Sequence, residues 1–120
     1  MKLALLLATL LALPNWVDAA EVTSARLNFS TNSIDVDVRY VGGCKDHRFE
    51  LQVQGCLETS PVRGEAKLVD RTRDDFCEGI MGRTASFSLA EYGFTDSYYR
   101  GATITITGDY STKAFVILPR

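Results

Sequence analysis

The chain has 120 residues, with 13 Lys and Arg against 15 Asp and Glu, so its formal net charge at pH 7 is −2. A nearly balanced, slightly acidic chain lacks the basic surface that nucleic-acid-binding proteins use, which excludes that class of function. A chain of this length supports one domain with a single hydrophobic core.

The N-terminus has the features of a secretory signal peptide. Lys2 supplies the basic start, residues 3–13 form an apolar run, and Val17-Asp18-Ala19 offers a cleavage site after Ala19. The apolar run is too short to cross about 30 Å of hydrocarbon, and a buried N-terminal helix is the less favoured alternative. We therefore expect residues 1–19 to be removed, leaving a periplasmic or secreted protein, residues 20–120, with no transmembrane segment.

Alternation of apolar and polar residues dominates the mature chain and predicts half-buried β-strands. The expected strands are, in chain order, residues 25–29, 34–40, 49–54, 65–70, 85–89, 103–107 and 114–118. Only two stretches, 76–81 and 89–92, could form a helical turn. About seven short strands separated by turn residues predict an all-β fold, a small antiparallel β-sandwich of immunoglobulin-like general shape, with a closed barrel as the alternative.

The chain has three cysteines, Cys44, Cys56 and Cys77, and an exported protein keeps its disulfides. If the strands on either side of Cys44 form an antiparallel hairpin, Cys56 lies on the order of 25 Å from Cys44. A disulfide requires Cα atoms within about 7 Å. The following strand would carry Cys77 back to the end that holds Cys44. We therefore predict a Cys44–Cys77 disulfide, with Cys56 left as a free thiol or available to a second chain.

His47 is the only histidine and lies three residues after Cys44. A copper(I) or zinc site, or a thiol-redox site, could use Cys44, His47 and Cys77. A catalytic Cys–His dyad is also conceivable, but no orienting residue or catalytic motif accompanies it. The favoured interpretation makes His47 a polar loop residue beside a disulfide, in a protein that is not an enzyme and binds no cofactor.

Acidic residues cluster around the third cysteine, at Asp70, Asp74, Asp75 and Glu78, with arginines between them. Their offsets and the absence of a glycine at the turn do not match a calcium-binding loop. We expect a solvated loop with ion pairs.

Four aromatic residues and an arginine crowd between the two strands expected at 85–89 and 103–107; they are Tyr92, Phe94, Tyr98, Tyr99 and Arg100. Tyr and Arg are the residue types that anchor interfaces, although tyrosines also cover the ends of β-sandwich cores. This segment is the candidate surface for a protein or glycan partner.

Two stretches carry a resemblance to known sequences. Gly42-Gly43-Cys44-Lys45-Asp46-His47-Arg48-Phe49, followed by Ser60-Pro61 and Asp75-Phe76-Cys77-Glu78, resembles a pattern in small exported bacterial proteins of unassigned function. Those proteins carry a Gly-Gly-Cys-x-x-His-x-Phe stretch and a later Asp-x-Cys-Glu. The resemblance implies export from a bacterial cell and no particular activity. Together with the residue patterns, it leads us to expect a non-enzymatic binding or envelope-associated domain.

Overall fold

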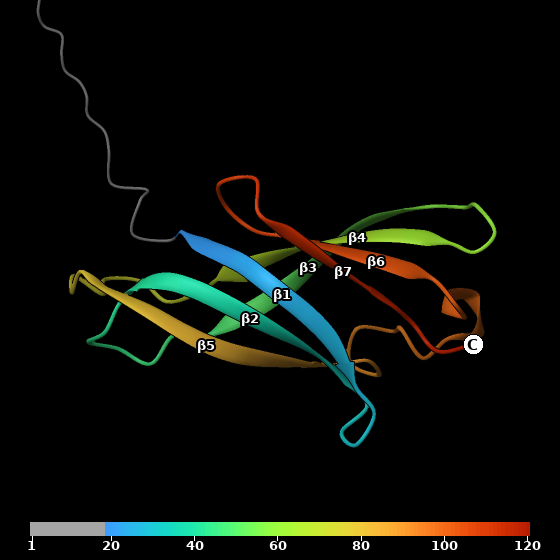
Figure 1. The fold of residues 1–120 in the computed structure, drawn as a ribbon, viewed down its shortest axis with the longest axis horizontal. Helices are drawn as coiled ribbons and strands as arrows, with labels where there is room; N and C mark the ends of the chain where they lie inside the picture. Colours follow the sequence, from blue (N-terminus) through green and yellow to red (C-terminus); the bar gives the residue numbers. More distant parts are fainter. Residues whose placement is uncertain (1–18) are drawn as a thin grey trace, which may run out of the picture.

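The computed structural model describes residues 19–120, so the predicted signal peptide lies, apart from Ala19, outside the described residues. Within them, seven strands form two packed sheets (Figure 1). The three-stranded sheet has the order β1-β2-β5, formed by Ala20–Asn28, Ser33–Gly42 and Gly79–Ser88. The four-stranded sheet has the order β3-β4-β6-β7, formed by Phe49–Leu57, Arg63–Asp70, Thr103–Thr107 and Lys113–Ile117. The predicted all-β sandwich is confirmed.

The only helix among these residues is the short 3-10 segment η3, Ser97–Tyr99. No helix in the described part of the chain is long and apolar enough to cross a membrane.

The connectivity differs from that of an immunoglobulin constant domain at one strand. In that domain the fourth strand joins the sheet of the first, second and fifth strands. Here β4 lies between β3 and β6, antiparallel to β3 and parallel to β6. The sandwich is therefore antiparallel except for the β4–β6 pair, which the expectation of a purely antiparallel fold did not include.

The core lies between the sheets, where the predicted alternation places it. In β2, Ile34, Val36 and Val38 are buried against the other sheet, while Asp37 and Arg39 lie on the outer face. Alternation with one wet face is the pattern of a sheet that packs on one side only. Burying each such aliphatic side chain contributes about 1.5–3 kcal/mol to folding.

One side of the sandwich is closed by contacts between β1 and the turn that joins β6 to β7. The amide of Ala20 donates to Asp109 Oδ2 at 2.7 Å, and the amide of Asp109 donates to the carbonyl of Ala20 at 2.8 Å. The amide of Val22 donates to Thr112 Oγ1 at 3.0 Å. Strands β1 and β7 therefore lie side by side, whereas β3 and β5 border the opposite, more open side.

The expected hairpin between β2 and β3 is wrong, because these strands belong to different sheets. β2 ends at Gly42, opposite Gly79, the first residue of β5. Residues 43–48 then cross to the other sheet, and residues 71–78 cross back from β4 to β5. Cys44 lies two residues after Gly42, and Cys77 lies two residues before Gly79. The two cysteines therefore meet because β2 pairs with β5, and not because β2 and β3 form a hairpin.

Candidate functional site

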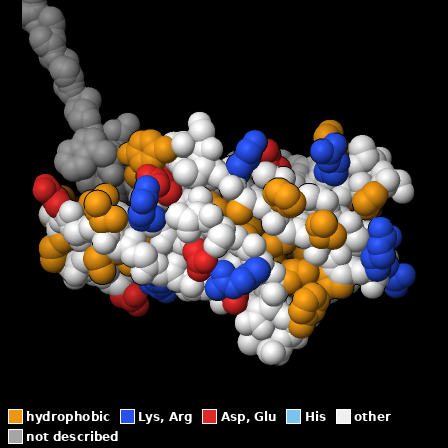
Figure 2. All heavy atoms as spheres, in the orientation of Figure 1, with side chains coloured by type: hydrophobic (Ala, Val, Ile, Leu, Met, Phe, Trp, Pro, Cys, Tyr) orange, Lys and Arg blue, Asp and Glu red, His pale blue; other side chains and the backbone are white. Residues whose placement is uncertain are grey.

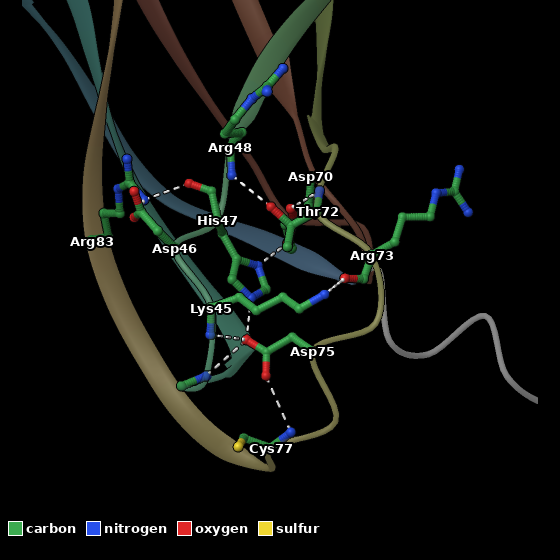
Figure 3. A network of polar contacts seen from close by, with 12 residues as sticks. Lys45, Asp46, His47, Arg48, Asp70, Thr72, Arg73, Asp75, Cys77 and Arg83 are labelled. Carbon is green, nitrogen blue, oxygen red and sulfur yellow. Dashed lines mark hydrogen bonds and ion pairs between the residues drawn. The ribbon is translucent and has the colours of Figure 1, made fainter.

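His47 lies buried between two carboxylates at the end of the sandwich where the sheets are joined by residues 43–48 and 71–78 (Figure 3). Its Nδ1 is 2.5 Å from Asp70 Oδ2 and its Nε2 is 2.6 Å from Asp75 Oδ2. Only 1% of the histidine surface is exposed. Since carboxylates accept hydrogen bonds, an imidazolium that donates from both nitrogens satisfies this geometry. We call His47, Asp70, Asp75 and the nearby disulfide the clamp.

The pKa of His47 reflects a competition that the carboxylates win. Burial alone would lower the pKa of His47, but the hydrogen bonds that its ring donates to Asp75 and Asp70, and the negative charges of these carboxylates, raise it above its usual value. The bond to His47 is the main cause that lowers the pKa of Asp75 to about 2, against the opposing effect of burial. Both shifts favour the charged forms of the pair.

Asp75 also orders the backbone of both crossing segments. Its carboxylate accepts hydrogen bonds, at 3.1–3.3 Å, from the amides of Gly43, Cys44, Lys45 and Cys77. A buried carboxylate with this many donors is well compensated for the loss of water.

The predicted Cys44–Cys77 disulfide is present, with its Cα atoms 5.7 Å apart. It lies directly beside Asp75 and ties the same two crossing segments covalently. Gly42 is required here by close approach, because a Cβ atom at this position would lie 2.6 Å from Asp75 Oδ2 and 2.7 Å from His47 Nε2. The motif residues Gly42, Cys44, His47, Asp75 and Cys77 thus build a single site.

Aromatic rings and an arginine cover the remaining sides of His47. The Tyr40 ring lies 4.4 Å from the imidazole, centroid to centroid, and the Phe49 ring lies 6.2 Å away. Arg83 donates from Nη1 to the carbonyl of His47 at 2.6 Å and pairs with Asp46 at 3.1 Å. Its guanidinium lies 5.5 Å from the centre of the Phe49 ring, on the open side between β3 and β5. Together with the two carboxylates, these residues leave the imidazole almost completely buried.

Phe76 stands out from this buried network into solvent. It is 76% exposed, although the residues on either side are fixed: Asp75 is buried in the clamp and Cys77 is in the disulfide. Asp74 and Glu78, one residue further out on each side, are exposed. The clamp therefore holds an aromatic side chain in water between two acidic residues.

Several expectations for these residues need correction. His47 lies in the loop before β3, as expected, but its side chain is buried between two carboxylates. The acidic segment is solvated only at Asp74 and Glu78, whereas Asp70 and Asp75 are buried. Cys56 is free, as expected, half-buried with its Sγ 3.5 Å from the Tyr99 hydroxyl, a contact that raises the pKa of Tyr99 to about 12.

The residues named in the alternative interpretation as metal ligands, Cys44, His47 and Cys77, do not meet as one ligand set. The sulfur atoms of Cys44 and Cys77 are bonded to each other, and both ring nitrogens of His47 face carboxylates. Asp75, which the sequence did not suggest as a ligand, has a carboxylate oxygen within 4.8 Å of both sulfur atoms.

The aromatic segment lies at the opposite end of the sandwich, near η3 (Figure 1). Phe94 is buried, and Tyr92 and Tyr99 pack beside it as ring pairs. Only Tyr98 and Arg100 of the five expected residues are exposed. Most of the segment therefore covers the end of the core, and the surface that it offers to a partner is smaller than its composition suggested.

Replacing Gly42 tests the packing of the clamp. Gly42→Ala should lower the free energy of unfolding by about 1–3 kcal/mol, because the new methyl group overlaps Asp75 and His47. Gly55→Ala is the matched control, since a Cβ there meets no atom within 4 Å, and it should change stability by less than about 0.5 kcal/mol. Urea unfolding measures both. Equal effects of the two substitutions would contradict the geometry of the clamp.

The free energy of unfolding should depend on pH in a definite direction. Because folding raises the pKa of His47 from 6.5, its contribution is complete below pH 6.5 and disappears as the pH rises through the folded value. Because folding lowers the pKa of Asp75 from 3.8 to about 2, its contribution is complete above pH 3.8 and disappears as the pH falls toward 2. Urea titrations should therefore find greatest stability between about pH 4 and 6.5.

His47→Gln is the control for the alkaline side of that profile. It should lower stability near pH 6 by about 3–5 kcal/mol, because two buried carboxylates lose their cation. The loss of stability above pH 6.5 should then vanish. If the variant keeps the alkaline slope of the original protein, another group produces it.

Comparison of the chain with protein-family models, with curated proteins and with solved structures found no match. What the protein does is therefore inferred from the chemistry of its own residues.

Proposed function

We propose that this protein is an exported, non-enzymatic binding domain that recognises a partner protein through Phe76. The observation that carries the proposal is the contrast within one short segment. Phe76 is 76% exposed, while Asp75 is fixed by His47 and Cys77 by the disulfide. Figure 2 shows hydrophobic side chains scattered over one face of the molecule, at both of its ends. At the clamped end, Phe76 and Ile80 are each 76% exposed.

Fixing the backbone on both sides of Phe76 favours binding. Much of the cost of association comes from ordering loops and side chains at the interface. Here the clamp orders the backbone around Phe76 when the protein folds. Less conformational entropy is therefore lost when a partner binds to the ring. Large aromatic side chains that fill a pocket are frequent binding hot spots, and burying one contributes about 1.5–3 kcal/mol.

The charges around Phe76 indicate the chemistry of the partner. Asp74 and Glu78 are exposed on either side of the ring. The Lys45 ammonium lies over the same segment, where its Nζ donates to the Arg73 carbonyl at 2.8 Å. An apolar pocket edged by basic groups would complement an aromatic ring between two carboxylates. A disulfide persists in an oxidising compartment, which supports export as part of the proposal.

Site-specific photo-crosslinking tests this function. A benzophenone amino acid placed at Phe76, in protein exported by its source cell, should give one discrete adduct. Phe29 is the matched control position, because it is 77% exposed but lies in the β1–β2 turn without a clamp. Excess unlabelled protein should compete for the adduct, whereas Phe76→Ala should compete at least about tenfold less well and keep its stability.

Two results would oppose the proposal. One is the same set of adducts from positions 76 and 29, which would indicate contact by exposure alone. The other is competition by Phe76→Ala as strong as that by the original protein.

A second candidate function is metal binding or thiol-redox chemistry by the reduced form of the clamp. The favouring observation is the approach of Cys44 Sγ, Cys77 Sγ and an Asp75 oxygen to within 4.8 Å of one another. Thiolate sulfur with one carboxylate is a ligand set that zinc accepts. In this structure the sulfur atoms form a disulfide and Asp75 is hydrogen-bonded to His47. Metal binding would therefore require a thiol reductant to supply two electrons to the disulfide, and the metal would then replace His47 as the partner of Asp75.

Thiol counting separates the two candidates. Native protein taken from its own compartment should contain no bound metal. The same protein, denatured and labelled without reductant, should show one reactive thiol, Cys56. Three reactive thiols together with stoichiometric zinc or copper would favour the second candidate and remove the fixed loop on which the first depends.

A further inference from the structure

Strand β5 is an edge strand without the features that usually protect an edge. It pairs with β2 over all 10 of its residues without a register shift, and its first half, Gly79–Thr84, is exposed. The other edges differ. β1 has a bulge between Val22 and Ser24, β3 has one between Val53 and Gly55, and β7 has only 5 residues. Bulges and short length prevent edge-to-edge pairing, and β5 has neither.

Arg83, the one charged residue of β5, is not placed to prevent another strand from pairing with this edge. Arg83 is engaged within its own subunit, where Nη1 donates to the carbonyl of His47 at 2.6 Å and pairs with Asp46 (Figure 3). A charge that points along the free edge would repel an incoming strand, but this one faces the mouth of the sandwich beside Phe49.

The outer face of β5 is complementary to itself. Ile80, Gly82 and Thr84 share this face, and Ile80 is 76% exposed. Two residues along, a Cβ atom at Gly82 would meet nothing within 4 Å. Ile80, Gly82 and Thr84, with Arg39 of β2, line a hollow of about 430 Å³. Ile80 therefore projects beside a hollow that it lines together with Gly82, the open position two residues along the strand.

We infer that two copies of this chain pair through β5 as antiparallel edge strands, related by a two-fold axis at Met81. In that register, Ile80 of each copy stands opposite Gly82 of the other, and its side chain enters the hollow. Arg83 stands opposite Gly79, and Glu78 opposite Thr84, so no like charges oppose each other. A contact in which each copy uses the same surface closes after two subunits. The two three-stranded sheets become one continuous sheet.

The pairing places the two clamps at opposite ends of the joined strands. Phe76 lies five positions from the axis, so the two rings would be on the order of 30 Å apart. Such a dimer would offer two recognition loops to a partner that is itself repeated or dimeric, with a gain in avidity. The pairing itself does not depend on the proposed role of Phe76.

Sedimentation of the exported protein tests the inference. In a Cys56→Ser background, which excludes a disulfide through the free thiol, the protein should be a dimer. Ile80→Lys should raise the dissociation constant at least about 100-fold, because it removes the apolar contact and places a charge at the edge. Ile117→Lys is the matched control, since Ile117 is 61% exposed on the edge strand β7, and it should remain a dimer.

A cysteine at the axis tests the register. Residues directly opposite in an antiparallel pair have Cα atoms about 4.5–5.5 Å apart, within the range of a disulfide. Met81→Cys in the same background should therefore form an intermolecular disulfide on mild oxidation, located by peptide mapping. Thr84→Cys, three positions from the axis, should not. A monomer at the highest soluble concentration, equal dissociation by both lysine substitutions, or cross-linking at Thr84→Cys in place of Met81→Cys would overturn the inference.

Discussion

Two hydrogen bonds hold His47 between Asp70 and Asp75, and the structure of this end of the sandwich depends on them. Two chain segments cross between the sheets here, one from β2 to β3 and one from β4 to β5, and both meet at this imidazole. Neither segment has a strand partner of its own. The buried charges replace the ladder of backbone hydrogen bonds that would otherwise fix them, and the disulfide adds a covalent tie between the same two segments.

The distribution of polar and apolar residues at this end is the reverse of the usual one. A histidine and two aspartates are buried, while Phe76 and Ile80 are exposed. Burying ionised groups is costly unless every one of them is paired, and here the amides around Asp75 complete the pairing. In some proteins a buried polar network specifies one conformation, and a single conformation of the loop is what the proposed contact through Phe76 requires.

The strands could be predicted from the sequence because alternation reports which face of a strand is buried. The position of β4 between β3 and β6 could not, since sheet order depends on long-range pairing that periodicity does not encode. The Cys44–Cys77 disulfide was predicted correctly from a hairpin that does not exist, because the pairing of Gly42 with Gly79 has the same effect. Asp70 and Asp75 were expected in a solvated loop, and their burial against His47 was not predicted. An acidic loop with arginines has the same composition whether its carboxylates face water or a buried histidine.

If the chain is cleaved after Ala19 during export, the hydrogen bond between the Ala20 nitrogen and Asp109 becomes an ion pair. In the uncut chain, the nitrogen of Ala20 that lies 2.7 Å from Asp109 Oδ2 is a neutral amide. After cutting, it is an α-ammonium group with a pKa of about 7.7–8.0, and the same two atoms form an ion pair. The Asp109 side chain is 36% exposed and also pairs with Lys67 Nζ at 3.6 Å, so water would screen the new pair in part. Maturation would then fasten β1 to the turn between β6 and β7 more firmly, and the finished domain would be more stable than its precursor.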